Sequence, residues 1–186
     1  MRAFIAIELS DEIKDALAQI QFHLKYAGAD VKWVEKDNIH LTLKFLGEID
    51  DKICGKVRDT LDEVAKSVRP FELSLKDIGA FPKIEFPRVI WVGLDKGAKE
   101  STEFAAKVDE SLSDLGFDKE TRPFTAHLTI GRVRSPKNKE ALKEKIQSYT
   151  LQPTPYTQLI SYLVLFQSTL TPKGPVYARL HEARLG

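Results

Sequence analysis

Cysteine is nearly absent from this sequence: Cys54 is the single one among 186 residues, so no disulfide can form within the chain. Cys54 falls inside an expected helix and is interpreted as a small buried hydrophobe. No Cys-x-x-Cys motif and no cluster of His and Cys residues has the spacing of a zinc site. We therefore expect neither a metal nor another cofactor.

Long apolar runs are also missing. No stretch approaches the roughly 18 consecutive apolar residues that a membrane-spanning helix needs. The chain starts directly with a strand-like segment, Arg2–Leu9, and shows no signal peptide. These features predict a cytoplasmic protein with no membrane partner.

The sequence also lacks an excess of charge of one sign. The 28 basic and 27 acidic residues leave a net charge of +1, which excludes a basic tail or a broad nucleic-acid footprint. If the partner is a nucleic acid, we expect the protein to bind only a short segment of it, such as a terminus. The length and the 42% of hydrophobic residues fit a single globular domain, and nothing demands more than a monomer.

Against this ordinary composition, one short pattern occurs twice. The first copy is His40-Leu41-Thr42-Leu43 and the second is His127-Leu128-Thr129-Ile130. Successive side chains of a strand point to opposite faces, so in each copy the apolar pair faces a core while His and Thr share the other face. From composition alone, the probability that two of the four histidines fit this pattern is roughly one in a thousand.

The order of predicted elements repeats as well. Both halves of the chain contain a strand, a helix, a His-x-Thr strand, a helix and a strand, with a spacing of about 87 residues. This order predicts an α+β fold in which two antiparallel sheets, each backed by helices, face each other across a V-shaped cleft. The chain would be one domain, residues 1–186, of two pseudo-symmetric lobes. The repeats cover about 1–84 and 85–186, and an exchange of terminal strands between the lobes stays open.

Hydrophobic periodicity and capping residues place the individual elements. Residues 79–87, rich in proline and aromatic side chains, are interpreted as a loop at the seam between the halves. The expected helices are 11–26, one from 50 or 51 to Pro70, 99–115, and one capped by Ser135-Pro136. The expected strands are 3–9, 31–34, 39–46, 71–75, 88–94, 126–133, 158–168 and 176–180.

The paired histidines favour acid–base catalysis. Histidine titrates near pH 6.5, so one imidazole can accept a proton from a nucleophile while the other donates one to a leaving group. The hydroxyls of Thr42 and Thr129 can donate hydrogen bonds to the two non-bridging oxygens of one phosphate. The histidines would then lie on either side of phosphorus, as in-line displacement requires.

Three further residues are candidate substrate contacts. Lys44 has the same strand parity as His40, so its ammonium would reach the phosphate. Arg132 follows the second motif and would neutralise the phosphate, although its parity is wrong unless Gly131 bends the strand. Phe124 has two interpretations, stacking on a base and packing in the core.

Two other interpretations of the motif stay open. In the first, the histidines grip the phosphate of an RNA end without catalysing a reaction. In the second, the duplication is purely structural and His40 and His127 lie far apart on different faces.

The sequence resembles the 2′-5′ RNA ligase/RNA 2′,3′-cyclic phosphodiesterase family of the two-histidine phosphoesterases. The resemblance covers essentially the whole chain. One departure is Ala126, where the family often has proline. The motifs that carry the resemblance are Phe4-Ile5-Ala6-Ile7, Trp33-Val34, Asn38–Gly47, Pro87–Gly93 and Phe124–Arg132.

This resemblance implies a metal-independent enzyme that opens an RNA 2′,3′-cyclic phosphate to a 2′-phosphate. It also implies 2′-5′ ligation, in which a ribose 5′-hydroxyl replaces water and joins tRNA halves. The partners would be RNA ends that carry a 2′,3′-cyclic phosphate. By the family pattern, His127 is the proton acceptor and His40 is the proton donor.

Overall fold

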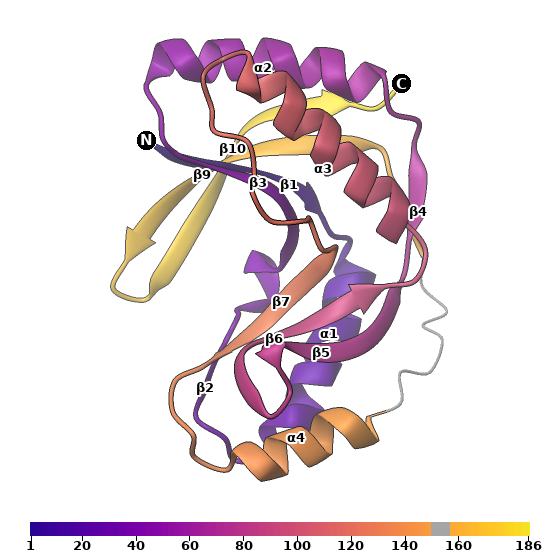
Figure 1. Cartoon of the computed structure of the whole chain (residues 1–186), viewed down its shortest axis with the longest axis vertical. Coiled ribbons are helices and arrows are strands. Elements are labelled where there is room, and N and C mark those ends of the chain that lie inside the picture. The colour runs from indigo at the N-terminus through magenta and orange to yellow at the C-terminus, as the bar shows by residue number, and fades with distance from the viewer. Residues whose placement is uncertain (150–156) are drawn as a thin grey trace.

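The computed structural model describes residues 1–149 and 157–186, which form an α+β fold (Figure 1). The helices are α1 (Asp11–Lys25), α2 (Asp51–Lys66), α3 (Ala98–Ser113) and α4 (Lys139–Ser148), with a short 3-10 turn η1 (Lys36–Asn38). The strands are β1 (Arg2–Glu8), β2 (Val31–Trp33), β3 (His40–Glu48), β4 (Phe71–Leu73), β5 (Leu75–Lys83), β6 (Phe86–Leu94), β7 (His127–Val133), β8 (Gln158–Ile160), β9 (Tyr162–Thr171) and β10 (Gly174–Arg184).

The strands form two four-stranded antiparallel sheets and one small pair. Sheet A has the order β10-β9-β1-β3, sheet B has the order β2-β7-β6-β5, and β4 pairs with β8. The first His-x-Thr motif begins β3 and the second begins β7. The predicted α+β class with antiparallel sheets and helices is confirmed.

Sheet membership does not follow the two halves of the sequence. Strand β1 lies between β3 and β9, so the first and last strands of the chain share sheet A. Strand β2, from the first half, pairs with β7 of sheet B. Each sheet is therefore built from both halves; β3 pairs with β1 at the edge of sheet A, and β7 lies between β2 and β6 in sheet B.

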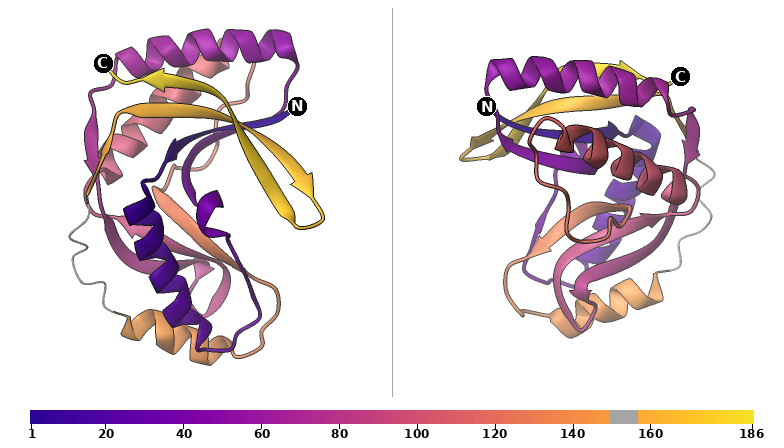
Figure 2. Two further views of the ribbon diagram at one scale, coloured as in Figure 1. Left: turned by 180° about the vertical axis from the view of Figure 1, so that it is seen from behind. Right: turned by 45° about the horizontal axis from the view of Figure 1, so that its top comes forward.

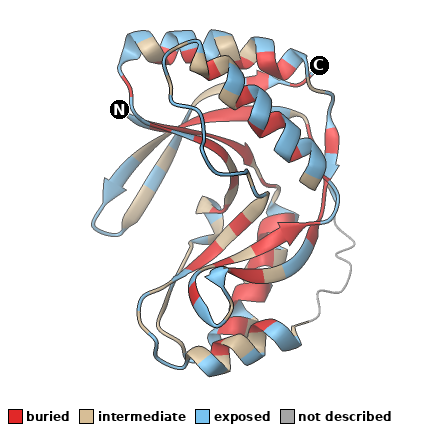
Figure 3. Ribbon diagram, in the orientation of Figure 1, coloured by how far each residue is buried: buried red, intermediate tan, exposed pale blue. Residues whose placement is uncertain are grey.

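Each sheet is covered by helices on one face. Helices α2 and α3 contact sheet A, whereas α1 and α4 contact sheet B (Figures 1 and 2). The apolar positions of both motifs point to these helices and join one continuous core, which appears as the buried interior in Figure 3. Fully buried members of this core include Ile5, Ile7, Leu41, Leu61, Val108 and Leu165 beside sheet A, and Leu17, Leu24, Ile90, Val92, Leu128 and Leu142 beside sheet B.

Two helices begin at the residues that their sequences predict. The Ser10 hydroxyl accepts a hydrogen bond from the backbone N–H of Ile13, and the Asp50 carboxylate accepts one from Ile53. Each side chain satisfies a donor that the first helical turn leaves unpaired. None of the helices in the described part of the chain is long and apolar enough to cross a membrane.

The predicted loop at 79–87 is wrong, because β5 and β6 form a long hairpin through this region. In the sequence, Pro82 and Pro87 favour a loop, because proline has no backbone N–H to donate a hydrogen bond to a neighbouring strand. Strand β5 is the outer strand of sheet B, and Pro82 pairs with Pro87 where the hairpin register shifts. Proline is tolerated at such edge and irregular positions.

Two predicted boundaries are also wrong. Helix α4 begins at Lys139 rather than at Ser135, and Asn138 precedes it with a left-handed φ of 54°. The predicted strand 158–168 divides at Ser161 into β8 and β9. The division arises because β8 pairs with β4 while β9 joins sheet A.

Candidate active site

His40 lies on the face of sheet A that the helices leave uncovered. Cross-strand pairs point to the same side of a sheet, and the register pairs His40 with Glu8 and Thr42 with Ala6. We call this side the histidine face of sheet A. It bears His40, Thr42 and a second apolar cluster formed by Phe4, Ala6, Val164 and Phe166.

Aromatic rings enclose the His40 imidazole. The ring stacks on Phe4, with centroids 4.7 Å apart and planes inclined by 28°, and meets the ring of Tyr177 edge-on at 5.3 Å. The pKa of His40 falls from 6.5 to about 4, mainly because the ring is desolvated; a hydrogen bond with the Asn38 backbone raises this pKa, and the charge of Lys14 lowers it. The imidazole of the free protein is therefore uncharged at neutral pH.

A β-bulge follows the first motif and reverses the strand parity. Ala6 pairs with Thr42 but Ile5 pairs with Lys44, so Leu43 is an extra residue in β3. Leu43 and Lys44 consequently both point to the helix-covered side and are buried. The expectation that Lys44 shares a face with His40 is wrong, because alternation holds only in a strand without a bulge.

Buried Lys44 has protein partners of its own. Its Nζ lies 2.5 Å from Oδ1 of Asp109 and donates to the carbonyl oxygen of Asp118 at 2.8 Å. Burial raises the pKa of Asp109, but the hydrogen bonds from Lys44 and from the Glu120 backbone outweigh it and hold this pKa below its usual value. Lys44 therefore anchors the segment after α3 to sheet A, and its predicted contact with phosphate loses its geometric basis.

His127 and Thr129 lie on the uncovered face of sheet B. Their register partners are Gly93 and Trp91, whereas buried Val92 pairs with Leu128 on the helix side. The Nδ1 atom of His127 is 2.6 Å from the carbonyl oxygen of Thr125. A carbonyl can only accept, so Nδ1 carries the proton of the neutral ring and Nε2 is left as the acceptor.

The second histidine has fewer aromatic neighbours than the first. The Phe81 ring meets the His127 ring edge-on at 5.0 Å, and Phe81 in turn lies 5.2 Å from the ring of Trp91. The indole of Trp91 crosses Gly79, where a Cβ atom would lie 2.2 Å from the ring. Glycine at position 79 thus allows Trp91 to lie flat on the sheet beneath Phe81.

A second bulge returns Arg132 to the face of His127. Thr129 pairs with Trp91 and Gly131 with Ile90, so Ile130 is the extra residue, and Arg132 then pairs with Val89. Val89 is two residues from Trp91 and shares its face. The bend that the Arg132 prediction required is present, and Gly131 also allows β2 to approach, since a Cβ atom there would lie 2.8 Å from Val31.

Arg132 connects the two sheets electrostatically. Burial raises the pKa of Tyr177, whereas the charges of Arg132 and Arg2 lower it. Tyr177 belongs to sheet A and lies against His40, so the charge of Arg132 acts on a residue of sheet A although its own strand belongs to sheet B. Strands β3 and β7 are also in direct contact.

Phe124 and the two histidines outside the motifs, His23 and His181, lie outside this group. Phe124 is half-buried and lies against the main core, which is the second of its two predicted roles. His23 lies beside Tyr149 with ring centroids 4.7 Å apart, and His181 is hydrogen-bonded to Asp62 on α2 at 2.8 Å. Within residues 1–149 and 157–186, no group of three or more His, Cys, Asp or Glu side chains is arranged to hold a metal ion.

Sequence reasoning missed the aromatic residues that surround the histidines, namely Phe4, Phe81, Phe166 and Tyr177. They come from four strands, β1, β5, β9 and β10, and none of these strands directly precedes or follows a motif strand in the sequence. Alternation in β1 places Phe4 and Ala6 on one face, but it does not reveal which face carries a histidine.

Comparison with known proteins identifies relatives along the whole chain. The family model of LigT-like phosphoesterases matches residues 7–91 and again residues 92–177. A protein of Methanocaldococcus jannaschii named RNA 2′,3′-cyclic phosphodiesterase is 40% identical, and the alignment covers 98% of this chain and 99% of the relative. A protein of the same name from Methanothermobacter thermautotrophicus is 34% identical over 100% of this chain and 99% of its own length.

Solved structures show the same fold. TT0787 of Thermus thermophilus superimposes with a TM-score of 0.81 at 26% identity, covering 100% of this chain and 98% of that protein. Escherichia coli LigT in its apo form superimposes with a TM-score of 0.75 at 23% identity, covering 99% and 96%. The double match of one family model agrees with the duplicated His-x-Thr strands, and we conclude that the chain belongs to the LigT-like phosphoesterase family.

Proposed function

We propose that this protein is an RNA 2′,3′-cyclic phosphodiesterase that opens the cyclic phosphate to a 2′-phosphate by two-histidine acid–base catalysis. The observation that carries the proposal is the presence of His40 and His127 on the uncovered faces of two sheets whose motif strands touch. The names of the full-length relatives supply the substrate class.

The proposed reaction balances without a metal ion. Water attacks phosphorus and loses a proton to Nε2 of His127, the bond from phosphorus to the 3′-oxygen breaks, and His40 gives a proton to that oxygen. The products are a 2′-phosphate and a free 3′-hydroxyl. Thr42, Thr129 and Arg132 would hold the phosphate oxygens, since hydroxyl and guanidinium groups donate to anionic oxygen.

For His40 to act as the proton donor, the bound substrate must raise its pKa. Its imidazole is uncharged at neutral pH in the free protein because burial lowers its pKa to about 4. A phosphodiester anion beside the ring favours the protonated form and raises this pKa again. Binding of the negatively charged substrate therefore prepares His40 to act as an acid.

The proposal extends to 2′-5′ ligation. A ribose 5′-hydroxyl can take the place of water, lose its proton to His127 and form a 2′-5′ phosphodiester as the 3′-oxygen leaves. This step needs no further residue. It requires that the end of a second RNA, such as a tRNA half, reaches the same site.

A nucleoside 2′,3′-cyclic phosphate in EDTA provides the direct test. We expect turnover to the 2′-phosphate alone, measured by phosphorus NMR or chromatography, and a loss of about 10²- to 10⁴-fold in His40→Ala and in His127→Ala. His23→Ala is the matched control, because His23 lies on α1 next to Tyr149 and should keep full activity. Binding without turnover in the unmodified protein would instead identify a non-catalytic RNA-end binder.

A further inference from the structure

Lys32 is an exposed lysine on the uncovered face of sheet B, directly opposite Arg132. The register pairs the two residues across β2 and β7, so both side chains point to the same side of the sheet. The bulge at Ile130 places Arg132 on the side that carries His127 and Thr129. A second cation therefore lies next to Arg132, on a strand that carries neither histidine.

Two like charges at directly opposed positions destabilise a sheet, whereas opposite charges stabilise it. At the next pair on this side, the backbone N–H of Arg134 donates to the carbonyl oxygen of Asp30, which places a base opposite an acid. Lys32 and Arg132 have no such balance, because neither forms an ion pair with an acidic side chain of residues 1–149 and 157–186. Local rules of this kind are broken most often at functional sites. An anion bound between the two side chains would remove their repulsion.

Lys32 is close to the proposed reaction centre, at a distance that one nucleotide can span. The partners of Thr129 and Arg132 on β6 are two residues apart, so the two positions are separated by two ladder steps of about 3.3 Å. Lys32 lies about 5 Å further, across the sheet. Its backbone is therefore on the order of 10 Å from that of Thr129, and its flexible side chain can shorten this gap. One phosphate at Thr129 and another at Lys32 would be separated by a single ribose.

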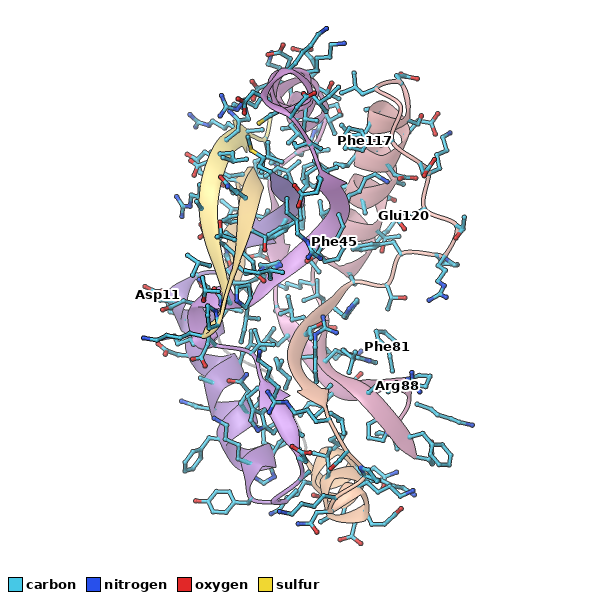
Figure 4. The ribbon with its side chains drawn as sticks, turned by 90° about the vertical axis from the view of Figure 1, so that its left-hand side faces the viewer. Asp11, Phe45, Phe81, Arg88, Phe117 and Glu120 are labelled. Carbon is cyan, nitrogen blue, oxygen red and sulfur yellow. The ribbon has the colours of Figure 1, made fainter. Side chains whose placement is uncertain are left out.

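The two sides of His127 differ in chemistry. Sheet B ends at β5 on one side, where Figure 4 shows Phe81. The Phe81 ring lies 5.0 Å from His127 and 5.2 Å from Trp91, so this side is aromatic. The sheet ends at β2 on the other side, where Lys32 and Arg132 are the neighbouring cations. A polyanionic strand that starts at His127 is therefore attracted toward β2.

We propose that Lys32 binds the phosphodiester that joins the terminal nucleotide to the rest of the RNA, while Arg132 holds the cyclic phosphate. The inference rests on the proposed function, which places the cyclic phosphate at His40 and His127. A lysine acts as a point charge on one phosphate, and such a contact carries no sequence information. Lys32 thereby favours RNA ends over nucleosides that carry only a cyclic phosphate.

The test compares two substrates that differ in one phosphodiester. The first is adenosine 2′,3′-cyclic phosphate, and the second is the same compound with a methyl phosphate ester on its 5′-oxygen. We expect Lys32→Met to lower kcat/KM for the second substrate by about 10-fold, mainly through KM, because the contact is the same in the ground state and the transition state. The first substrate should change by less than about 2-fold.

Two further variants complete this experiment. Lys32→Arg keeps the charge and should keep the preference for the 5′-phosphorylated substrate. Lys99→Met removes the same charge from α3, where Lys99 is exposed and paired with Glu103, and should treat both substrates as the unmodified protein does. An equal loss on both substrates in Lys32→Met, or no loss on either, would overturn the inference.

The stability of Lys32→Met tests the repulsion itself. Because the substitution removes a charge opposite Arg132, its urea midpoint should equal or exceed that of the unmodified protein. A loss of activity on the 5′-phosphorylated substrate then cannot arise from unfolding. A lower midpoint would show that Lys32 stabilises the sheet and would overturn the argument from repulsion.

A binding measurement separates this inference from the proposed function. Calorimetric titration with the dinucleotide uridylyl-adenosine 2′-phosphate at several salt concentrations needs no turnover. In Lys32→Met the binding should weaken, and the slope of log affinity against log salt should be less steep by about 0.7, the value for one phosphate contact to a single strand. This result would support the contact even in a protein that hydrolyses nothing. An unchanged affinity and slope would overturn it even if hydrolysis is confirmed.

Discussion

The two copies of the His-x-Thr motif are nearly identical in sequence and differ sharply in their surroundings. His40 stacks on Phe4 and meets Tyr177 edge-on, and desolvation of its ring is the main reason that its pKa falls to about 4. His127 meets one ring, Phe81, edge-on, although both histidines are half-buried. A duplicated motif thus places its two imidazoles in different aromatic surroundings.

The bulges after the two motifs have opposite effects on charge. In β3 the extra residue takes Lys44 away from the histidine face and buries it against Asp109. In β7 the extra residue brings Arg132 onto the histidine side, and its charge acts on Tyr177. Each strand carries a cation close to its motif, but only one of these cations is available to a substrate.

Lys44→Met gives the largest expected effect on stability. It leaves the carboxylate of Asp109 without its main partner, and because this carboxylate is only 19% exposed, we expect a loss of about 2–3 kcal/mol in the free energy of unfolding. Activity per folded molecule should change by less than about 3-fold, since Lys44 does not face His40. Urea denaturation and kinetics of the same sample measure both quantities.

Lys66→Met is the control for this substitution. Lys66 forms an exposed ion pair with Glu63 one helical turn away on α2, and its loss should leave the free energy of unfolding essentially unchanged. A Lys44→Met protein that is stable but has lost its activity would contradict the assignment of opposite roles to the two bulges.

The pH dependence of stability should distinguish the two histidines. Because the folded protein holds the pKa of His40 at about 4, the unfolded chain binds a proton at this residue between pH 6.5 and pH 4 that the folded protein does not bind. The free energy of unfolding should therefore decrease by on the order of 2–3 kcal/mol as the pH falls through this range. His40→Gln should remove that loss, which denaturation at several pH values can measure.

His127→Gln is the matched variant for the pH experiment. It should leave the acid-dependent loss of stability in place, since the buried imidazole of His40 is still present. An equal change in slope for both variants would mean that the aromatic enclosure of His40 has no electrostatic consequence.

Arg132→Ala should have a smaller effect than the substitutions of Lys44 and His40, and this effect should be on activity and not on stability. Removing a guanidinium that binds the phosphate should lower kcat/KM by about 10-fold, while the unfolding free energy changes by less than about 0.5 kcal/mol because the side chain is exposed. Arg69→Ala is the control, an exposed arginine that follows α2 on the helix side of the fold. Equal activities of the two variants would place Arg132 outside the site.

Much of the fold follows from local physics and could be predicted. The helices beginning after Ser10 and Asp50 combine a capping side chain with a regular apolar stripe, and both begin where predicted. The hairpin of β5 and β6 was missed because its prolines argue against strands unless the outer position of β5 is known. The strand at 158–168 was not divided because its two parts pair with strands that are distant in sequence.

The features of the candidate site also divide into those that follow from local sequence and those that depend on the tertiary structure. By itself the sequence determined that His and Thr share one side of each motif strand, because alternation within four residues needs no information from elsewhere. Only the tertiary structure decided what lies beyond those four residues. Bulges at Leu43 and Ile130 arise from the fit of β3 to β1 and of β7 to β6, and they bury Lys44, expose Phe45 and redirect Arg132. Strands β1 and β10 of the same sheet likewise bring Phe4 and Tyr177 to His40, so its low proton affinity is a property of the assembled sheet and not of the motif.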